Sequence, residues 1–394
     1  MKDVVRIGVV GLGARGLEAV ARLPGVPSAQ VAALCDPTAK DARKIPNCAF
    51  FFGDEGYKAL CQMPLDLIYV ATDWAHHVPV ALEAMACGKA VAIEVPAALT
   101  LEDCFALVEA SEKSSRPCVQ LENCIYGEIE MLAENLARQG VLGEVVHCEN
   151  SYIHRLFGPG STPQEPWRIA WNLSHRGNQY VTHALGPLAR IMGIGSGDEM
   201  DFLVSLECDA MDFKAFAREQ GFEAGPDAMG DHNTTAIRTK KGRTILLRHD
   251  VASVRPRTRS LHVQGEKGVL TDEPFRIAIE PVRDAAKLPE IYEIPWLEPE
   301  ERERMRTDFM HPLWREHGDK IRTADKHGGM DYLMDLRLIE AVRTGSKPDT
   351  DVYDLAEWCS IAELSERSVR NRSAPVQIPR FRPAARAGNQ ESGI

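Results

Sequence analysis

Residues 7–16 read Ile7-Gly8-Val9-Val10-Gly11-Leu12-Gly13-Ala14-Arg15-Gly16, and the organisation of the chain can be worked out from them. The first four residues form an apolar run, as expected of a buried parallel strand. A G-x-G-x-x-G pattern follows at once, and residues 17–23 continue it as an amphipathic helix. Gly11 permits a tight turn, Gly13 lets a pyrophosphate approach the backbone, and Gly16 lets the helix pack closely on the strand. This context predicts a phosphate-binding turn in a dinucleotide-binding domain.

Strands and helices alternate through the first third of the chain. Further strands are predicted at 31–35, 65–71, 90–93 and 118–121, with helices at 78–87 and 101–113. Gly88 suits the end of the first of these helices, and Thr100 suits the N-cap of the second. The alternation predicts a parallel, doubly wound α/β sheet of the Rossmann type with helices on both faces. We place this dinucleotide-binding domain at residues 1–123.

Strands dominate the pattern after residue 123. Residues 240–243, Lys240-Lys241-Gly242-Arg243, have the composition of a hairpin turn between two of them. Two helices are predicted near the end, at 330–343 and 352–370. Runs of strands without intervening helices predict an α+β domain with a large, mostly antiparallel sheet, which we place at residues 124–394. The predicted strands are 145–153, 202–207, 235–239, 243–249 and 261–264.

The composition excludes several classes of protein. Among 394 residues, 46 are basic and 57 acidic, for a net charge of −11. This charge argues against nucleic-acid binding and against attachment to an anionic membrane. No apolar run approaches the roughly 20 residues of a membrane helix, and the N-terminus lacks the apolar region of a signal peptide, so we expect a cytoplasmic protein. None of the ten cysteines lies in a C-x-x-C pair, and no metal site is predicted.

Asp36 indicates which dinucleotide is bound. It follows the second strand and lies 20 residues after Gly16. A carboxylate in this place accepts hydrogen bonds from both ribose hydroxyls and repels a 2′-phosphate. The sequence therefore predicts NAD rather than NADP as the cofactor.

Polar and aromatic residues follow the next three strands, at the edge where open parallel sheets bind ligands. Trp74 could pack on a ribose or on nicotinamide, and His77 could hydrogen-bond the cofactor, although His76 and His77 equally fit a solvated helix start. Glu94 fits either a contact to the nicotinamide end or a helix N-cap partner. Residues 122–123, Glu122-Asn123, also fit the nicotinamide end.

This layout resembles the Gfo/Idh/MocA oxidoreductases, in which a Rossmann domain precedes a sheet domain and Glu-x-Pro follows the fourth strand. Those proteins usually have lysine where this chain has Val95, and aspartate four residues before the catalytic histidine, where Gln179 precedes His183. One branch, glycoside hydrolase family 109, shares both departures, and its type activity is NAD-dependent α-N-acetylgalactosaminidase. The resemblance covers nearly the whole chain and is most specific at 180–187 and at 327–331.

The resemblance implies roles for individual residues. The family has a tyrosine in a segment like 255–259, where this chain has Arg257, so one sugar contact changes from a phenol to a cation. The other implied sugar contacts are Tyr152, Arg168, Tyr180, Val181, Thr182 and His183. The implied NAD contacts are Ala14, Arg15, Asp36, residues 74–77, Glu94, Val95 and Asn123.

The resemblance also implies a redox-assisted elimination. C3 of the sugar is oxidised by NAD⁺, the resulting ketone acidifies the C2 proton, and loss of that proton expels the group at C1. Water then adds, and the hydride returns to C3. His183 is the candidate base for the 3-hydroxyl, because histidine titrates near neutral pH. Tyr180 and Tyr152 can act as acid or base where a nearby cation lowers their pKa, a charge that Arg168 could supply, and the two are not assigned separately.

Three functions remain open at this point. We favour the redox-assisted glycosidase, and the alternatives are a plain NAD-dependent sugar or cyclitol dehydrogenase and a non-catalytic NAD-binding protein. Two late helices would leave one broad face of the second sheet uncovered, and uncovered apolar faces of that size usually mark an interface. We therefore expect a homodimer or a higher homo-oligomer acting on a small glycoside.

Overall fold

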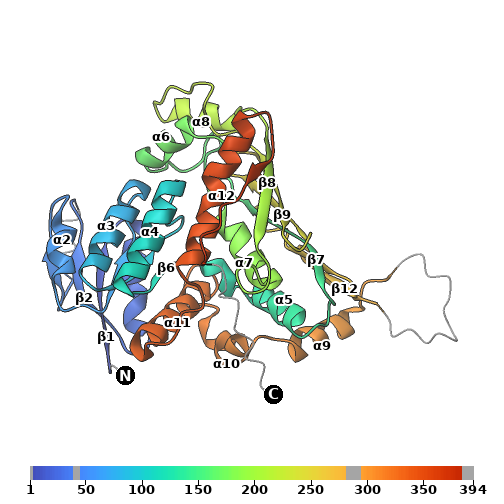
Figure 1. The fold of residues 1–394 in the computed structure, drawn as a ribbon, viewed down its shortest axis with the longest axis horizontal. Helices are drawn as coiled ribbons and strands as arrows, with labels where there is room; N and C mark the ends of the chain where they lie inside the picture. Colours follow the sequence, from blue (N-terminus) through green and yellow to red (C-terminus); the bar gives the residue numbers. More distant parts are fainter. Residues whose placement is uncertain (1–2, 39–44, 281–293, 384–394) are drawn as a thin grey trace, which may run out of the picture.

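The computed structural model describes residues 3–38, 45–280 and 294–383, which form two sheets with helices packed around them (Figure 1). A six-stranded sheet comes from the N-terminal part and an eight-stranded sheet from the remainder. Helix α12 (Val352–Arg370) runs between them and packs on helix α4 (Leu101–Ser114) and on strand β8 (Met200–Glu207). Among the described residues, no helix combines the length and the apolar character that crossing a bilayer demands.

The first sheet is parallel throughout and has the strand order β3-β2-β1-β4-β5-β6. This is the order of a Rossmann fold, in which ligands bind beside β1, where the strand order reverses. Its central strands are buried and apolar because helices cover both faces. The predicted parallel, doubly wound sheet is confirmed. The strands are β1 (Val5–Val10), β2 (Ala29–Cys35), β3 (Ala49–Phe51), β4 (Leu67–Val70), β5 (Ala90–Ile93) and β6 (Cys118–Gln120).

The second sheet has the order β13-β12-β11-β7-β10-β9-β8-β14. Its neighbours are antiparallel except for β7 and β10, which pair in parallel, so the predicted mostly antiparallel sheet is confirmed. The predicted hairpin turn joins β9 to β10, and Gly242 at its tip has a φ of +82°. The strands besides β8 are β7 (Val145–Ile153), β9 (Asn233–Thr239), β10 (Thr244–Asp250), β11 (His262–Gly265), β12 (Gly268–Asp272), β13 (Phe275–Ile279) and β14 (Val376–Gln377).

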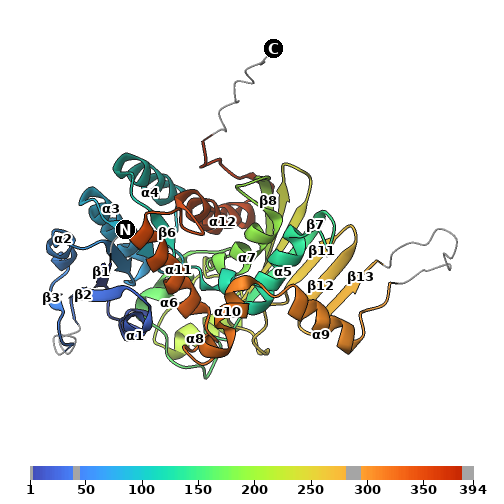
Figure 2. The ribbon, with the colours of Figure 1, turned by 90° about the horizontal axis from the view of Figure 1, so that it is seen from below.

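Helices α5 (Glu128–Arg138), α7 (Thr182–Met192) and α12 lie on the same side of the second sheet (Figures 1 and 2). Their apolar residues and those of the sheet form a continuous core. Helix α9 (Pro299–Asp308) lies near β12 and β13, at the end of the sheet far from the Rossmann domain (Figure 2). The other helical segments are α1 (Ala14–Arg22), η1 (Leu23–Gly25), α2 (Gly56–Cys61), α3 (Trp74–Ala86), η3 (Asn123–Tyr126), α6 (Pro166–Ser174), α8 (Asp212–Glu219), α10 (Pro312–Ile321) and α11 (Met330–Thr344).

Two sequence predictions are corrected by these elements. The expectation of strands without intervening helices is wrong, because α6 and α7 separate β7 from β8, and α8 separates β8 from β9. Most of α7 is buried, so it shows no polar stripe by which an amphipathic helix would be recognised. Helix α3 begins at Trp74 rather than at residue 78, because Asp73 acts as N-cap and accepts a hydrogen bond from the amide of His76.

Candidate active site

The turn between β1 and α1 has the geometry that phosphate binding requires. Gly11 has a φ of +91°, and a Cβ on it would lie 2.5 Å from the carbonyl carbon of Ala71. A Cβ on Gly16 would lie 1.9 Å from the carbonyl oxygen of Gly11. A Cβ on Gly13, in contrast, would have no heavy atom within 4 Å. The first and third glycines are therefore required by close packing, whereas the second leaves room for a ligand at the start of α1.

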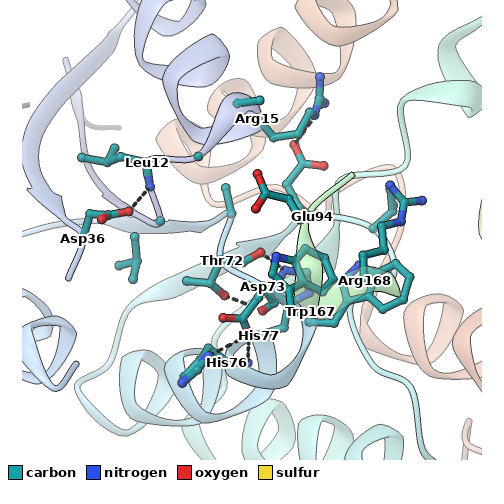
Figure 3. Close-up of a pocket in the computed structure, with 18 of the residues that line it drawn as sticks. Leu12, Arg15, Asp36, Thr72, Asp73, His76, His77, Glu94, Trp167 and Arg168 are labelled. Carbon is teal, nitrogen blue, oxygen red and sulfur yellow. Dashed lines mark hydrogen bonds and ion pairs between the residues drawn. The ribbon is translucent and has the colours of Figure 1, made fainter. Parts of the chain in front are cut away.

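Asp36 lies at the end of β2 beside this turn (Figure 3). Its Oδ2 accepts a hydrogen bond from the amide of Leu12 at 2.8 Å, and its Oδ1 accepts one from the amide of Thr38 at 2.7 Å. These bonds fix the orientation of the carboxylate next to the turn. The observed place of Asp36 is the one from which a carboxylate contacts a ribose.

A cavity of about 810 Å³ extends from the glycine turn to the second sheet. Gly13 and Asp36 line one part of it, and Tyr152 and His183 line another. The open space at Gly13 and the oriented carboxylate fit the phosphates and the ribose of a dinucleotide. The part lined by the second domain is left for a small substrate.

The first turn of α3 carries two histidines in different surroundings. His77 is buried, and its ring nitrogens lie 2.9 Å from the carbonyl oxygen of Pro96 and 3.1 Å from that of Thr72. Burial lowers the pKa of His77. Its nitrogens are thus directed at backbone carbonyls of two strand ends. His76 is exposed and its Nδ1 lies 2.7 Å from Asp73, as expected of a solvated helix start.

Arg15 connects several of the predicted cofactor residues at one wall of the cavity (Figure 3). Its guanidinium lies 3.0 Å from Glu94 and 3.1 Å from the buried Asp331. Asn123 donates to the other oxygen of Asp331 at 2.7 Å. The carboxylate of Glu94 therefore pairs with Arg15 rather than with a helix N-terminus. Val95 lines the cavity next to Glu94.

Tyr152, Tyr180 and His183 meet in the second domain. Their ring centroids are separated by 4.9 Å for the two tyrosines, 5.3 Å for Tyr152 and His183, and 5.1 Å for Tyr180 and His183. Tyr152 lies near the end of β7, His183 lies in the first turn of α7, and Tyr180 precedes the N-cap residue of that helix. The Nδ1 of His183 lies 2.6 Å from Oε1 of Glu122. Within the described parts of the chain, its other ring nitrogen has no hydrogen-bond partner and is available to a ligand.

The two tyrosines are not acidified in the way the sequence suggested. Desolvation by burial raises the pKa of Tyr152. Desolvation also raises the pKa of Tyr180, and the neighbouring Tyr152 raises it more. Arg168 lowers both pKa values but does not outweigh the desolvation. Both pKa values therefore lie above the ordinary value for tyrosine, so the net lowering that the sequence analysis named as the condition for acid–base action is not seen, although Arg168 does act in that direction.

Arg168, on α6, lies among aromatic rings at the cavity wall. Its guanidinium carbon is 4.9 Å from the ring centroid of Tyr180 and 5.3 Å from that of Trp74. Trp167 lies 5.2 Å from Trp74, edge to face. These rings give the cavity an aromatic wall, with the guanidinium of Arg168 against it; Figure 3 shows Trp167 and Arg168 side by side.

Three predicted sugar contacts lie away from the cavity wall. Val181 and Thr182 are buried in the start of α7 and do not line the cavity. Arg257 is exposed in the loop after β10, also outside the lining residues. Arg259, two residues further, is the arginine that contacts a predicted catalytic residue, with its guanidinium carbon 5.6 Å from the ring of Tyr152.

Sequence reasoning missed two polar partners within the site. Glu122 was placed at the nicotinamide end, whereas its carboxylate holds His183. His327 lines the cavity, and its Nδ1 lies 2.9 Å from Asp331. The carboxylates of Glu122, at a strand end, and of Asp331, in a short motif, were visible in the sequence. Their partners could not be seen, because each contact depends on how distant segments pack.

Comparison with known proteins identifies both halves of the chain. Residues 5–121 match the family model "Oxidoreductase family, NAD-binding Rossmann fold", and residues 126–386 match "Glycosyl hydrolase 109, C-terminal domain". The chain is 41% identical over 399 residues to glycosyl hydrolase family 109 protein 1 of Bacteroides fragilis, covering 96% of this chain and 85% of that protein. It is 39% identical over 396 residues to the glycosyl hydrolase family 109 protein of Porphyromonas gingivalis, with 96% and 85% covered.

Solved structures share the fold at low sequence identity. Levoglucosan dehydrogenase, in complex with NADH and L-sorbose, superposes with a TM-score of 0.73 at 16% identity, covering 96% of this chain and 99% of that one. An oxidoreductase domain protein from Kribbella flavida gives 0.72 at 18% identity, with 96% and 100% covered. At these identities the likeness concerns the fold alone. The NAD-binding family model over the first domain supports a nicotinamide cofactor.

Proposed function

This chain belongs to glycosyl hydrolase family 109, and on that premise we propose that it is an NAD-dependent glycosidase acting through transient oxidation of the sugar at C3. The proposed substrate is an α-N-acetylgalactosaminide or a related glycoside. The observation that carries the proposal is the cluster of Tyr152, Tyr180 and His183 in the cavity that also contains the glycine turn.

The first domain supplies the residues that would hold NAD. The backbone around Gly13 would contact the phosphates, Asp36 would contact the ribose, and Arg15, Glu94 and Asn123 would form the wall nearer the second domain. When bound, NAD supplies the acceptance of a hydride from C3 and its return at the end of the cycle, so it is unchanged overall. A carboxylate at Asp36 selects against the 2′-phosphate of NADP.

His183 takes the proton of the sugar 3-hydroxyl as C3 is oxidised. Its Nδ1 is occupied by Glu122 at 2.6 Å, so Nε2 is the atom free to accept a proton. The carboxylate stabilises the imidazolium that results. Glu122 is therefore the carboxylate partner of His183, whereas Gln179, four residues before it, accepts a hydrogen bond from Nε1 of Trp171 at 2.9 Å.

Tyr152 or Tyr180 exchanges the proton at C2. A ketone at C3 makes that proton acidic, and its removal expels the group at C1, after which water adds to C1. The tyrosine that accepts the proton must first lose its own, which desolvation disfavours. Arg259 beside Tyr152 and Arg168 beside Tyr180 supply the positive charge that stabilises such a phenolate. No pair of carboxylates at C1 is needed, in contrast to ordinary glycosidases.

Hydrolysis in D₂O tests this mechanism. The product of an aryl α-N-acetylgalactosaminide should carry deuterium at C2 by NMR, and no net NADH should accumulate. A substrate with its 3-hydroxyl removed should not be cleaved, because it cannot be oxidised. An ordinary glycosidase would cleave it and leave C2 unlabelled.

The same experiment separates the glycosidase from a plain sugar or cyclitol dehydrogenase. A dehydrogenase would release NADH in proportion to the substrate consumed and would leave the glycosidic bond intact. Cleavage without deuterium at C2, or rapid cleavage of the 3-deoxy substrate, would contradict the elimination. NADH release without cleavage would move the assignment to the dehydrogenase.

A further inference from the structure

Two arginines after β10 project to the same face of the second sheet as Tyr152. Thr258 forms an isolated antiparallel bridge with Ile153, and its amide donates to the carbonyl of Ile153 at 3.2 Å. Residues on either side of an antiparallel bridge pair in reverse order. Arg259 is therefore opposite Tyr152, and Arg257 is opposite His154.

Neither arginine forms an ion pair with a carboxylate of the described residues. Within the described ranges, no acidic side chain lies within the 4.0 Å of an ion pair from Arg257 or Arg259. Arg257 is exposed and free to meet a ligand. Arg259 places Nη2 2.9 Å from Sγ of Cys124, while its buried Nη1 has no hydrogen-bond partner among the described residues.

Arg168 adds a third guanidinium on the side of Tyr180. Its Nε is buried and has no hydrogen-bond partner among residues 3–38, 45–280 and 294–383. Its contacts are instead with the rings of Tyr180 and Trp74, at 4.9 and 5.3 Å. Tyr152 and Tyr180 are thus flanked by Arg259 on one side and by Arg168 on the other, and neither arginine has an ion pair among the described residues.

The carboxylates around this region are few or already engaged. Glu122 is held by His183, and Glu165 is exposed at the cavity wall. Burial raises the pKa of the Glu130 carboxyl, although Arg259 opposes this rise. Burial lowers the pKa of Arg259, but Cys124, Glu130, Tyr152 and Glu122 outweigh this and raise it, so Arg259 is partly compensated without an ion pair. The pKa of His154 is lowered by burial and then by Arg257, Arg259 and Arg168, which reports a positive local potential.

Arg168 lines the cavity, whereas Arg257 and Arg259 lie beyond its lining residues, next to His154 and Tyr152. Guanidinium groups without an ion pair at the edge of a binding site favour an anionic ligand, because a poorly solvated cation is stabilised by a counter-charge. In a chain of net charge −11, such a cluster is not a general feature of the surface. Guanidinium groups bind carboxylates and the oxygens of sulfate and phosphate esters through paired hydrogen bonds.

We propose that the glycoside substrate carries an anionic group, a carboxylate, sulfate ester or phosphate ester, which Arg257 and Arg259 bind while Arg168 adds to the attraction. This inference rests on the proposed glycosidase function, whose substrate class it specifies. Because Arg257 and Arg259 are not among the residues that line the cavity, the anion would extend from the sugar ring past Tyr152 to the edge of the cavity.

Matched substrates test the proposal on the NAD-loaded enzyme. The probes are the 4-nitrophenyl α-glycosides of N-acetylgalactosamine, of its 6-sulfate and 6-phosphate, and of galacturonic acid. At least one anionic glycoside should have a kcat/KM about tenfold or more above the neutral one, the effect of one charge-assisted hydrogen bond. The anionic glycoside with the highest kcat/KM identifies the anion. Added salt should reduce kcat/KM for the anionic glycosides only.

Variants then locate the anion. Arg257→Gln should reduce the ratio of anionic to neutral kcat/KM by about tenfold. Arg255→Gln removes the same charge from an exposed position two residues away and should leave the ratio unchanged. Arg257→Lys, which keeps the charge, should retain part of the preference.

Binding without turnover separates this proposal from the proposed function. If no glycoside is cleaved, titration calorimetry of the NAD-loaded enzyme with the same sugars should still show tighter binding of an anionic sugar, lost in Arg257→Gln. Cleavage of the neutral glycoside with no anionic preference in rate or binding overturns the anion site and leaves the glycosidase standing. A preference unchanged in Arg257→Gln also overturns it.

Discussion

In the proposed mechanism, His183 depends as a base on a carboxylate that is distant in sequence. Glu122 holds its Nδ1, so the imidazole has one orientation and one free nitrogen. Burial alone would raise the pKa of Glu122, but its interactions with His183 outweigh this effect and the pKa is lowered. Glu122 is therefore a charged carboxylate beside His183. Glu122 thus acts on the substrate only through His183, as a positioning residue.

Glu122→Gln should lower kcat about 10²-fold, at the lower end of the contribution of a general base, because the amide does not stabilise an imidazolium. KM should change much less, since Glu122 does not contact the substrate. Steady-state kinetics and the pH dependence of kcat check this result. Glu144→Gln, at an exposed carboxylate before β7, is the control and should behave as wild type. Equal losses in both variants would count against a positioning role.

Asp36 should decide between NAD and NADP. Asp36→Ala removes the charge that repels a 2′-phosphate, so binding of NADP should tighten relative to NAD by about tenfold. Fluorescence titration with the two reduced cofactors measures this ratio. Asp36 also bonds the amide of Leu12, so the thermal midpoint is measured alongside. Recovery of NADP rather than NAD from denatured wild-type protein would refute the assignment.

Residues whose role depends on local sequence could be predicted, and those whose role depends on register could not. Gly11, Gly16 and Asp36 lie where the motif puts them, because the turn and the strand that carry them are local structures. The exposed position of Arg257 and the contact of Arg259 with Tyr152 follow from the bridge between Thr258 and Ile153. That bridge joins segments about a hundred residues apart and leaves no sequence signal.

Among the elements, those with a clear apolar period were predicted best. Strand β7 and helix α12 have the predicted bounds. The apolar residues of α12 recur with the helical period, whereas β7 shows only an interrupted alternation between apolar residues at its two ends. Strands β12 and β13 and helices α5 to α10 were missed. Helix α9 has no buried residue, and α7 is buried along most of its length, so neither shows one apolar face.

Helices α1 and α11 are joined across the two domains by buried charges. Arg22 lies 2.6 Å from Asp335 and 3.4 Å from Asp331, which also accepts from Arg15, Asn123 and His327. The charged neighbours lower the pKa of Asp331 despite its burial. This network fixes the wall that Arg15 and Glu94 form at the cavity, where we propose that NAD binds.

Asp331→Asn should destabilise the protein, because it leaves Arg15 and Arg22 without a charged partner they share. Breaking a buried ion pair outright typically costs about 3–5 kcal/mol. Because Arg15 keeps Glu94 and Arg22 keeps Asp335, the cost should lie below that range and lower the thermal midpoint by a few degrees. Asp308→Asn, at an exposed carboxylate of α9, is the control and should leave the midpoint unchanged. A midpoint for Asp331→Asn equal to that of the control would show that the network adds no stability. Calorimetry with and without NAD makes the comparison.

At the scale of the whole molecule, the second sheet has one face covered by helices and one face left exposed. Helices α5, α7 and α12 pack on its inner face (Figures 1 and 2). On the outer face, Val204, Ala236 and Leu246 form a row across β8, β9 and β10. Arg238 and Arg248 lie beside this row. An apolar strip with a polar rim is typical of an interface between subunits.

We therefore expect the protein to be a homodimer or a higher homo-oligomer that associates through this face. Light scattering should give at least about twice the 43.6 kDa of one chain at micromolar concentration. Leu206, next to the apolar row, is 66% exposed, and Leu206→Glu would place a charge in the interface without disturbing the core, so the mass should fall toward that of one chain. Leu17→Glu, at an exposed leucine of α1, should leave the mass unchanged. A wild-type mass near 43.6 kDa would contradict association, and an oligomer that survives Leu206→Glu unchanged would place the interface elsewhere.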